Sequence, residues 1–186
     1  MYLFLVPLVM GFAFNLASAF TATFSRRWGE QRGSVVTIIL RDILGIPLWT
    51  IGFVLAARAP SPILLVSSTM TNAAGWSMIV AGCVIILTAL VTIRLKAAMP
   101  STQDVLVQTG LYAHVRHPIH TGTFLEFAGL FLLIPTQTVA LACALGIVWI
   151  LVQTRLEEFD LLQRLPMYRE YMRRVPRFLP RFRTKS

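Results

Sequence analysis

Apolar residues run along this chain in long blocks that are separated by short polar or basic stretches. A membrane-spanning helix needs roughly 20 mostly apolar residues, and residues 2–24 supply one such block without a charged side chain. Two further blocks cover residues 35–57, which include Arg41 and Asp42, and residues 75–93. The pattern therefore predicts three membrane spans in the first half of the chain.

Two shorter apolar blocks follow, over residues 122–134 and 139–152. Pro135 and the three polar residues after it form a turn signal that is just long enough to join two antiparallel helices. We therefore predict a helical hairpin, with its arms extended back to His117 and forward to Leu156. The hairpin brings the number of predicted spans to about five.

Composition agrees with a membrane protein, because 56% hydrophobic residues and a mean hydropathy of +0.69 exceed what a soluble core of 186 residues can bury. Beyond the fifth block, apolar residues recur at helical spacing and predict an amphipathic segment against membrane or core: Leu156, Phe159, Leu162 and Leu165. The predicted fold class is an all-α integral membrane protein with about five transmembrane helices and a cytoplasmic C-terminal amphipathic helix. Residues 1–99 would hold the first three spans. Residues 100–186 would hold a cofactor-binding loop, the hairpin and a C-terminal catalytic helix of the same integral domain.

The basic residues predict an orientation, because cytoplasmic loops carry an excess of Lys and Arg. They gather after the first and third spans and in the C-terminal tail, whereas the opposite side has only Arg58. We expect a non-cytoplasmic N-terminus and a cytoplasmic C-terminus, with the first span retained because no basic residue precedes Arg26. The net charge of +9 then fits this topology and anionic membrane lipids, and no nucleic-acid partner is expected.

The two cysteines add no chemistry to this picture. Cys83 and Cys143 each lie within a span among aliphatic residues, where a thiol behaves as a small hydrophobe. Neither a disulfide nor a metal site is expected, and the candidate chemistry lies in two polar clusters in the second half of the chain.

The first polar cluster surrounds Pro118, a residue suited to the first turn of a helix, which places His117 near the cap. Free backbone amides at a helix start, beside Arg116, can bind an anionic group. Gly110 permits a turn that folds the chain back over this point, and Tyr112 adds an aromatic face. The alternative is that Arg116, His117 and Tyr112 are ordinary interface residues at head-group depth.

The second polar cluster holds Glu157, Glu158 and Asp160, three of the eight acidic residues of a basic chain. These acids could serve only to solubilise a helix and to pair with neighbouring arginines. Together, however, the two clusters have the charges to hold a zwitterion, with amides and Arg116 for a carboxylate and glutamates for cationic groups. S-adenosylmethionine has that charge pattern.

Five short stretches carry a family resemblance: Gly110-x-Tyr112, Arg116-His117-Pro118 with Gly122, Glu157-Glu158, Tyr168-x-x-Tyr171 and Val175-Pro176-Arg177. In these residues the chain resembles the isoprenylcysteine carboxyl methyltransferase family, as a short member of the prokaryotic type. The resemblance covers roughly residues 100–182, and its core is the family's RHPxYxG motif paired with a downstream EE. The sequence departs from the family at His120, where a tyrosine is usual, and at Leu165-Pro166, where Phe-Gly is usual.

The resemblance implies an S-adenosylmethionine-dependent methyltransferase that methylates the carboxylate of an isoprenylcysteine-like lipidated substrate and releases S-adenosylhomocysteine. The substrate would enter from the bilayer. By motif position, the residues implied to line the cofactor are Leu106, Val107, Tyr112, Arg116, His117, Pro118, Ile119, His120 and Glu157. Arg155 and Glu158 are implied to face the substrate side as the catalytic residues.

A carboxylate acceptor is ionised at neutral pH, so methyl transfer would depend on positioning, and Arg155 is the candidate cation that orients it. Two other functions stay open. One is methylation of a phospholipid amine or another lipid, in which His120 or Glu158 would accept the proton. The other is a non-enzymatic membrane subunit. Glu126 lies inside a span, where it would line a substrate cavity or pair within the bundle.

Overall fold

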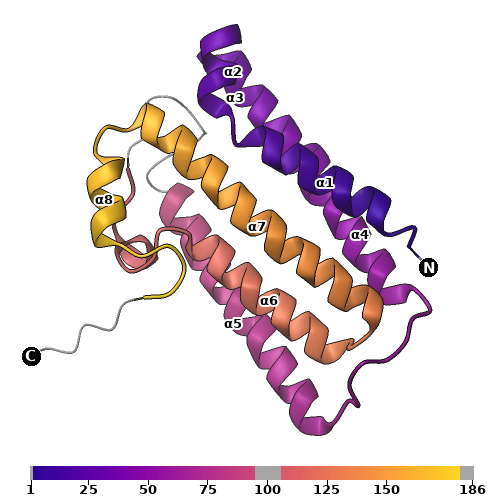
Figure 1. The fold of residues 1–186 in the computed structure, drawn as a ribbon. Helices are drawn as coiled ribbons and strands as arrows, with labels where there is room; N and C mark the ends of the chain where they lie inside the picture. The colour runs from indigo at the N-terminus through magenta and orange to yellow at the C-terminus, as the bar shows by residue number, and fades with distance from the viewer. Residues whose placement is uncertain (1, 95–105, 181–186) are drawn as a thin grey trace, which may run out of the picture.

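The computed structural model describes residues 2–94 and 106–180, and within these ranges every regular element is a helix (Figure 1). The one exception is an isolated β-bridge between Ile63 and Thr136. The elements are α1 (Leu5–Ser18), α2 (Thr21–Trp28), α3 (Glu30–Ile38), η1 (Ile39–Gly45), α4 (Ile46–Arg58), α5 (Thr69–Arg94), η2 (Gly110–Ala113), α6 (Pro118–Leu133), α7 (Gln137–Arg164) and α8 (Tyr168–Arg174). The predicted all-α fold is confirmed. The boundary placed between residues 99 and 100 lies outside the described residues.

Three helical stretches are long and apolar enough to cross a membrane: Glu30–Arg58, Thr69–Ile93 and Gln137–Arg164. The first predicted span is not one straight helix, because α1 and α2 meet at 63° and count as a fourth span only as a bent pair. Phe20 leaves helical geometry at this break, with ψ at 43°. The first arm of the hairpin, α6, has only 16 residues. The length criterion thus supports three or four spans, and the count of about five is not confirmed.

A polar residue of the first span contacts the backbone of the second span where that span is a π-helix. Residues 39–45 form a π-helix between α3 and α4, and the buried Asn15 donates from Nδ2 to the carbonyl of Arg41 at 3.4 Å. A Cβ on Gly45 would lie 1.7 Å from that Asn15 nitrogen, so only glycine leaves room for it. Arg41 itself pairs with its neighbour Asp42 at 2.8 Å on an exposed surface.

Helices α5 and α6 pack closely because glycines face each other at two levels. A Cβ on Gly122 would lie 2.7 Å from the carbonyl oxygen of Gly82, and one on Gly129 would lie 2.6 Å from that of Gly75. Small residues that allow backbones to approach are typical of helix contacts in membranes. This interface fixes the start of α6, and hence the first polar cluster, against α5.

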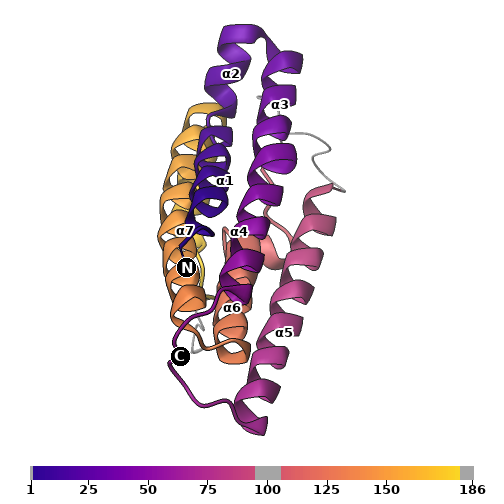
Figure 2. The same ribbon diagram turned by 90° about the vertical axis from the view of Figure 1, so that its right-hand side faces the viewer.

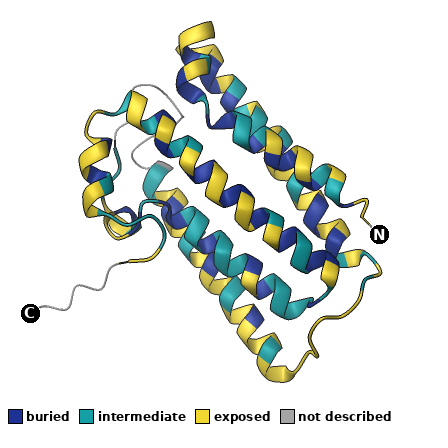
Figure 3. Ribbon diagram, viewed as in Figure 1, coloured by how far each residue is buried: buried dark blue, intermediate teal, exposed yellow. Residues whose placement is uncertain are grey.

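Aromatic side chains fill the space between α1, α4, α6 and α7. Phe12 stacks on Trp149 with ring centroids 4.7 Å apart, and Phe53 stacks on Phe127 at 5.0 Å. Buried positions lie along the facing sides of the helices, whereas exposed apolar residues cover the outside (Figure 3). An apolar outer surface of this kind suits a helix bundle surrounded by lipid.

Helix α7 forms the second arm of the hairpin and extends well beyond the predicted block, through Arg164. The predicted amphipathic stripe from Leu156 to Leu165 is therefore the end of α7 and not a separate helix. The separate C-terminal helix is the short α8, which buries Tyr168 and Tyr171. The hairpin prediction is confirmed, with α6 and α7 joined through Pro135 and Thr136.

The connections that carry the basic residues lie at one end of the bundle. The turn between α2 and α3, the start of α6 and the end of α7 lie toward this end, while the α4–α5 and α6–α7 connections lie toward the other (Figures 1 and 2). The two polar clusters are at the basic end. The fold thus agrees with the grouping of basic loops from which the orientation was predicted.

Candidate functional site

The two polar clusters meet where α6 begins and α7 approaches its end. Arg116 Nη2 lies 2.8 Å from Glu158 Oε1, and both side chains are almost completely buried. His117 Nε2 lies 3.3 Å from the same oxygen. The fold therefore joins the RHP stretch to the EE stretch, which the sequence separates by some forty residues.

A third contribution comes from the segment after α8. Arg177 donates to both oxygens of Glu158, at 3.1 Å from Nε and 2.5 Å from Nη2. Glu158 thus accepts hydrogen bonds from two guanidinium groups in an almost solvent-free position, where unpaired charges would be costly. Arg177 belongs to the residues that carry the family resemblance, but its contact with Glu158 was not predicted.

Backbone contacts tie the same segment to the start of α6. The amides of Arg116 and His117 donate to the carbonyls of Pro176 and Arg177 at 2.9 and 3.1 Å. The expectation that the amide of His117 is free to bind an anion is therefore wrong. The guanidinium of Arg116 is also committed, because Nη1 donates to the carbonyls of Met172 and Val175, both at 2.8 Å.

The loop before α6 is held by two tyrosines. Gly110 has φ at +60°, the turn geometry expected of it, and starts the short helix η2 that contains the buried Tyr112. Tyr171 donates its hydroxyl proton to the carbonyl of Tyr112 at 2.6 Å. Burial raises the pKa of Tyr112 and raises that of Tyr171 to about 12, so both phenols stay neutral at physiological pH.

Glu157 points to a different side of α7 and is more accessible than Glu158. Its side chain is 33% exposed, against 4% for Glu158. Gln153, one turn earlier, donates to Glu157 Oε1 at 2.8 Å, and His117 Nδ1 lies 3.6 Å from Oε2. The carboxylate of Glu157 is thus oriented but not enclosed.

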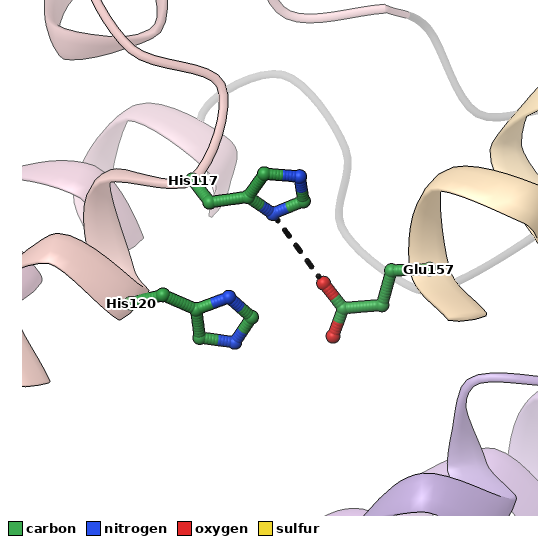
Figure 4. A group of neighbouring side chains, drawn as sticks. All are labelled: His117, His120 and Glu157. Atoms are coloured by element: carbon green, nitrogen blue, oxygen red, sulfur yellow. Dashed lines mark ion pairs between the residues drawn. The ribbon is translucent and has the colours of Figure 1, made fainter. Parts of the chain in front are cut away.

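His120 completes this side of the site. Its ring stacks on that of His117, with centroids 5.4 Å apart and planes at 8°, and its Nδ1 lies 2.9 Å from Thr154 Oγ1. Figure 4 shows both imidazoles and the carboxylate of Glu157 turned toward one another. One potential ligand atom from each of the three residues lies within 4.8 Å of the others. No metal site was expected from the cysteines, and the spacing of His117, His120 and Glu157 along the sequence did not predict this group.

His117 connects the two sides electrostatically, because its two ring nitrogens face different glutamates. Burial lowers the pKa of His117, but the hydrogen bonds to Glu157 and Glu158 outweigh it, so the pKa of His117 is raised. The two carboxylates therefore stabilise the protonated imidazole more than water does in a free histidine.

The remaining candidate residues lie around this cluster with different degrees of access. Pro118 is buried at the start of α6, and the other candidate lining residues are half-buried: Leu106, Val107 and Ile119. Arg155 is exposed on α7, although its neighbour Thr154 is buried. Glu126 accepts a hydrogen bond from the thiol of Cys83 on α5 at 3.3 Å, which agrees with the alternative of pairing within the bundle.

The fold and the site describe a helical membrane protein with a charged cluster at one end of its bundle. Residues 73–163 match the model of the isoprenylcysteine carboxyl methyltransferase (ICMT) family. The resemblance drawn from the RHP and EE stretches is thereby confirmed. The tyrosines of α8 and Arg177 lie beyond the matched segment.

A relative among characterised proteins is named nickel-cobalt-cadmium resistance protein NccN, from Alcaligenes xylosoxydans xylosoxydans. It is 34% identical over 87 residues, which cover 44% of this chain and 40% of that protein. The chain thus spans less than half of the relative's length. No solved structure matches the chain.

Proposed function

We propose that this protein is a membrane-embedded, S-adenosylmethionine-dependent methyltransferase that methylates the carboxylate of an isoprenylcysteine-like lipidated substrate. The observation that carries the proposal is the junction of Arg116-His117-Pro118 with Glu157-Glu158 at one end of the bundle. Membership of the matched segment in a methyltransferase family supports the same conclusion. The apolar outer surface would let a lipid-modified substrate approach from the bilayer.

The residues on the Glu157 side suit a cationic and zwitterionic cofactor. Glu157 presents a partly exposed carboxylate that can meet an ammonium or sulfonium group, and the half-buried Leu106, Val107 and Ile119 offer apolar contact. Since the amide of His117 is used, the amides of Ile119 and His120 in the first turn of α6 are the donors we assign to the cofactor's carboxylate. When bound, S-adenosylmethionine supplies a methyl group on a sulfonium.

Glu158 has a different role from the one that motif position suggested. Its carboxylate is buried and engaged by Arg116, His117 and Arg177, so we assign it the positioning of the cluster and not contact with the substrate. Arg116 was expected to contact the cofactor, but we assign it to positioning the cluster as well, because it pairs with Glu158. These two residues hold His117 and the adjacent Glu157 at the junction of α6 and α7.

Arg155 stays our candidate for the cation that orients the substrate carboxylate. It is exposed on α7 and has the planar donor fork that binds a carboxylate in a bidentate manner. Arg155→Lys should lower the methyl-transfer rate while leaving affinity for S-adenosylmethionine unchanged. Rates near those of the wild type in both Arg155→Lys and Arg155→Ala would refute this role.

One observation favours an amine acceptor as the second candidate function. Thr154 engages Nδ1 of His120, which leaves Nε2 on the side of Glu157 as a nitrogen that could accept a proton. Glu158, the other proton acceptor considered, is already engaged by two arginines. A phospholipid amine would then replace the prenylcysteine as substrate.

Purified protein in detergent, incubated with labelled S-adenosylmethionine, would distinguish these functions. The acceptors are a farnesylcysteine, a geranylgeranylcysteine, their methyl esters as blocked controls, and phosphatidylethanolamine. We expect label in the prenylcysteines and none in the esters. Label in phosphatidylethanolamine alone would establish the amine function. Absence of transfer to every acceptor, together with absence of S-adenosylmethionine binding, would favour a non-enzymatic subunit.

We further propose that the basic end of the bundle faces the cytoplasm, as the placement of arginines indicates. Single cysteines at Ser67 and Arg173, introduced after Cys83→Ala and Cys143→Ala, would test this orientation in intact cells. An impermeant thiol reagent should label the cysteine at position 67 from outside and reach the one at position 173 only after lysis. The reverse pattern would contradict the proposed topology.

A further inference from the structure

The side of the cluster that contains His117, His120 and Glu157 has the donor atoms of a metal site. Two imidazoles and one carboxylate contribute one atom each within 4.8 Å of one another. They come from two elements, the start of α6 and the last part of α7, which the aromatic core and the Glu158 ion pairs hold together. Figure 4 shows the three side chains converging on one volume.

Each of these three side chains is oriented by a second residue on the side away from the shared volume. His117 Nε2 lies 3.3 Å from Glu158, His120 Nδ1 lies 2.9 Å from Thr154, and Glu157 Oε1 accepts from Gln153 at 2.8 Å. Metal-ligating histidines usually donate their other ring N–H to a carboxylate or another oxygen. That arrangement leaves His117 Nδ1, His120 Nε2 and Glu157 Oε2 as the ligand atoms.

We propose that His117 Nδ1, His120 Nε2 and Glu157 Oε2 bind one divalent transition-metal ion of the zinc, cobalt or nickel type. Metal binding displaces the proton from Nδ1 of His117 and selects the tautomers in which His117 donates to Glu158 and His120 donates to Thr154. Imidazole and carboxylate ligands suit these ions, whereas Mg²⁺ and Ca²⁺ prefer oxygen-only sites. Three protein ligands leave a further coordination position open to water.

The distances are compatible with this assignment. Bonds of about 2.0–2.2 Å place two ligand atoms on one ion about 3–4 Å apart, and His117 Nδ1 and Glu157 Oε2 are separated by 3.6 Å. The widest pair, at up to 4.8 Å, would close by about 1 Å on binding. Glu157, with a 33% exposed side chain, has the room to make that adjustment.

The site depends on His120, which occupies the position where the resembled family usually has tyrosine. It also shares His117 and Glu157 with the proposed cofactor side, so a bound ion and S-adenosylmethionine would compete there. Metal binding in the absence of S-adenosylmethionine does not require that the protein transfer methyl groups. The two proposals therefore fail or succeed separately.

The test is calorimetric titration of Zn²⁺ into chelator-treated protein in detergent, purified with an affinity tag that contains no histidine. We expect one Zn²⁺ per chain and no response to Mg²⁺. His120→Tyr and Glu157→Gln should each weaken Zn²⁺ binding at least about 100-fold, because removal of a ligand exceeds the 10–100-fold loss typical of an outer-shell change. Thr154→Val, which removes only the partner of His120, should weaken it about 10–100-fold.

His114→Tyr is the matched control, because His114 is the one histidine of the chain outside the proposed site and is exposed. It should bind Zn²⁺ like the wild type. Co²⁺ added to the wild type should give visible absorption bands that His120→Tyr abolishes. Absence of saturable Zn²⁺ binding in the wild type, or undiminished binding by both His120→Tyr and Glu157→Gln, would overturn the proposal. If His120→Tyr does not fold, Glu157→Gln and Thr154→Val decide the question.

Discussion

Glu157 and Glu158 are neighbours in the sequence, but the two sides of α7 on which they lie have opposite characters. Glu158 is 4% exposed and contacts Arg116, His117 and Arg177. Glu157 is 33% exposed and contacts His117 and Gln153. Consecutive residues of a helix point about 100° apart, so one side of the helix end builds the structure and the other remains accessible to a ligand.

Glu158 therefore has a structural role in the charged cluster, whereas Glu157 is available to bind a ligand. The Glu158 side has a nearly complete set of cationic and backbone partners, so its removal should affect folding first. On the Glu157 side, hydrogen bonds with Gln153, Thr154 and Glu158 orient three side chains. These are Glu157, His120 and His117, and they point toward one shared volume. A binding site requires side chains that are held in position by their neighbours and that a ligand can still reach.

The largest expected effect comes from removing the buried carboxylate. Glu158→Ala should lower the free energy of unfolding by about 3–5 kcal/mol, because it leaves Arg116 buried without its ionic partner. Thermal unfolding in detergent, followed by circular dichroism, would measure the loss. Stability equal to that of the wild type would show that the Glu158 side does not hold the two segments together.

A smaller effect is expected at the third acid of this helix end. Asp160 Oδ1 accepts from the amide of Ala22 at 2.9 Å, in the first turn of α2, and Oδ2 accepts from Arg164 at 2.7 Å. A carboxylate at a helix N-terminus acts as a cap, so Asp160→Ala loses about 0.5–2 kcal/mol of capping and also one buried ion pair with Arg164, whereas Glu158→Ala removes the partner of two arginines and an imidazole. The same unfolding measurement should place this variant between Glu158→Ala and the wild type, and a larger loss than for Glu158→Ala would contradict the ranking.

The smallest effect is expected at an exposed carboxylate that serves as a control. Glu170 pairs with Arg174 at 3.2 Å, but both side chains are about 60% exposed. Glu170→Gln should change stability by less than about 0.5 kcal/mol, since exposed pairs one helical turn apart contribute little. If Glu170→Gln lowered the free energy of unfolding as much as Glu158→Ala does, the loss in Glu158→Ala could not be assigned to its buried ion pairs.

The sequence predicted the helices whose apolar blocks are long and continuous, and less of what depends on contacts between them. The hairpin around Pro135 followed from a turn signal, and α5 followed from hydropathy alone. The break at Phe20 was not predicted, because residues 2–24 are apolar on both sides of it. The π-helix after Ile38 ends at Gly45, against which Asn15 packs, and hydropathy does not encode this contact between helices.

For the site, the family resemblance brought together the RHP and EE stretches, and the structure confirms that they touch. The resemblance did not predict the ion pair between Arg116 and Glu158, because that contact depends on which side of α7 faces the segment after α8. Gln153 was missed, although its spacing of four residues from Glu157 is a recognisable helical pair. Thr154 gave no such signal, because its partner His120 comes from another helix.

The most direct test of the account is titration of S-adenosylmethionine into wild-type protein and into Glu157→Gln, with Glu170→Gln as the control. We expect saturable binding by the wild type and the control. Affinity should fall by about 1.5–3 kcal/mol in Glu157→Gln, which loses a charge-assisted contact to the cofactor, and circular dichroism should show that the variant is folded. Equal affinity in a folded Glu157→Gln protein, or no saturable binding by the folded wild type, would contradict the assignment of the Glu157 side to the methyl donor.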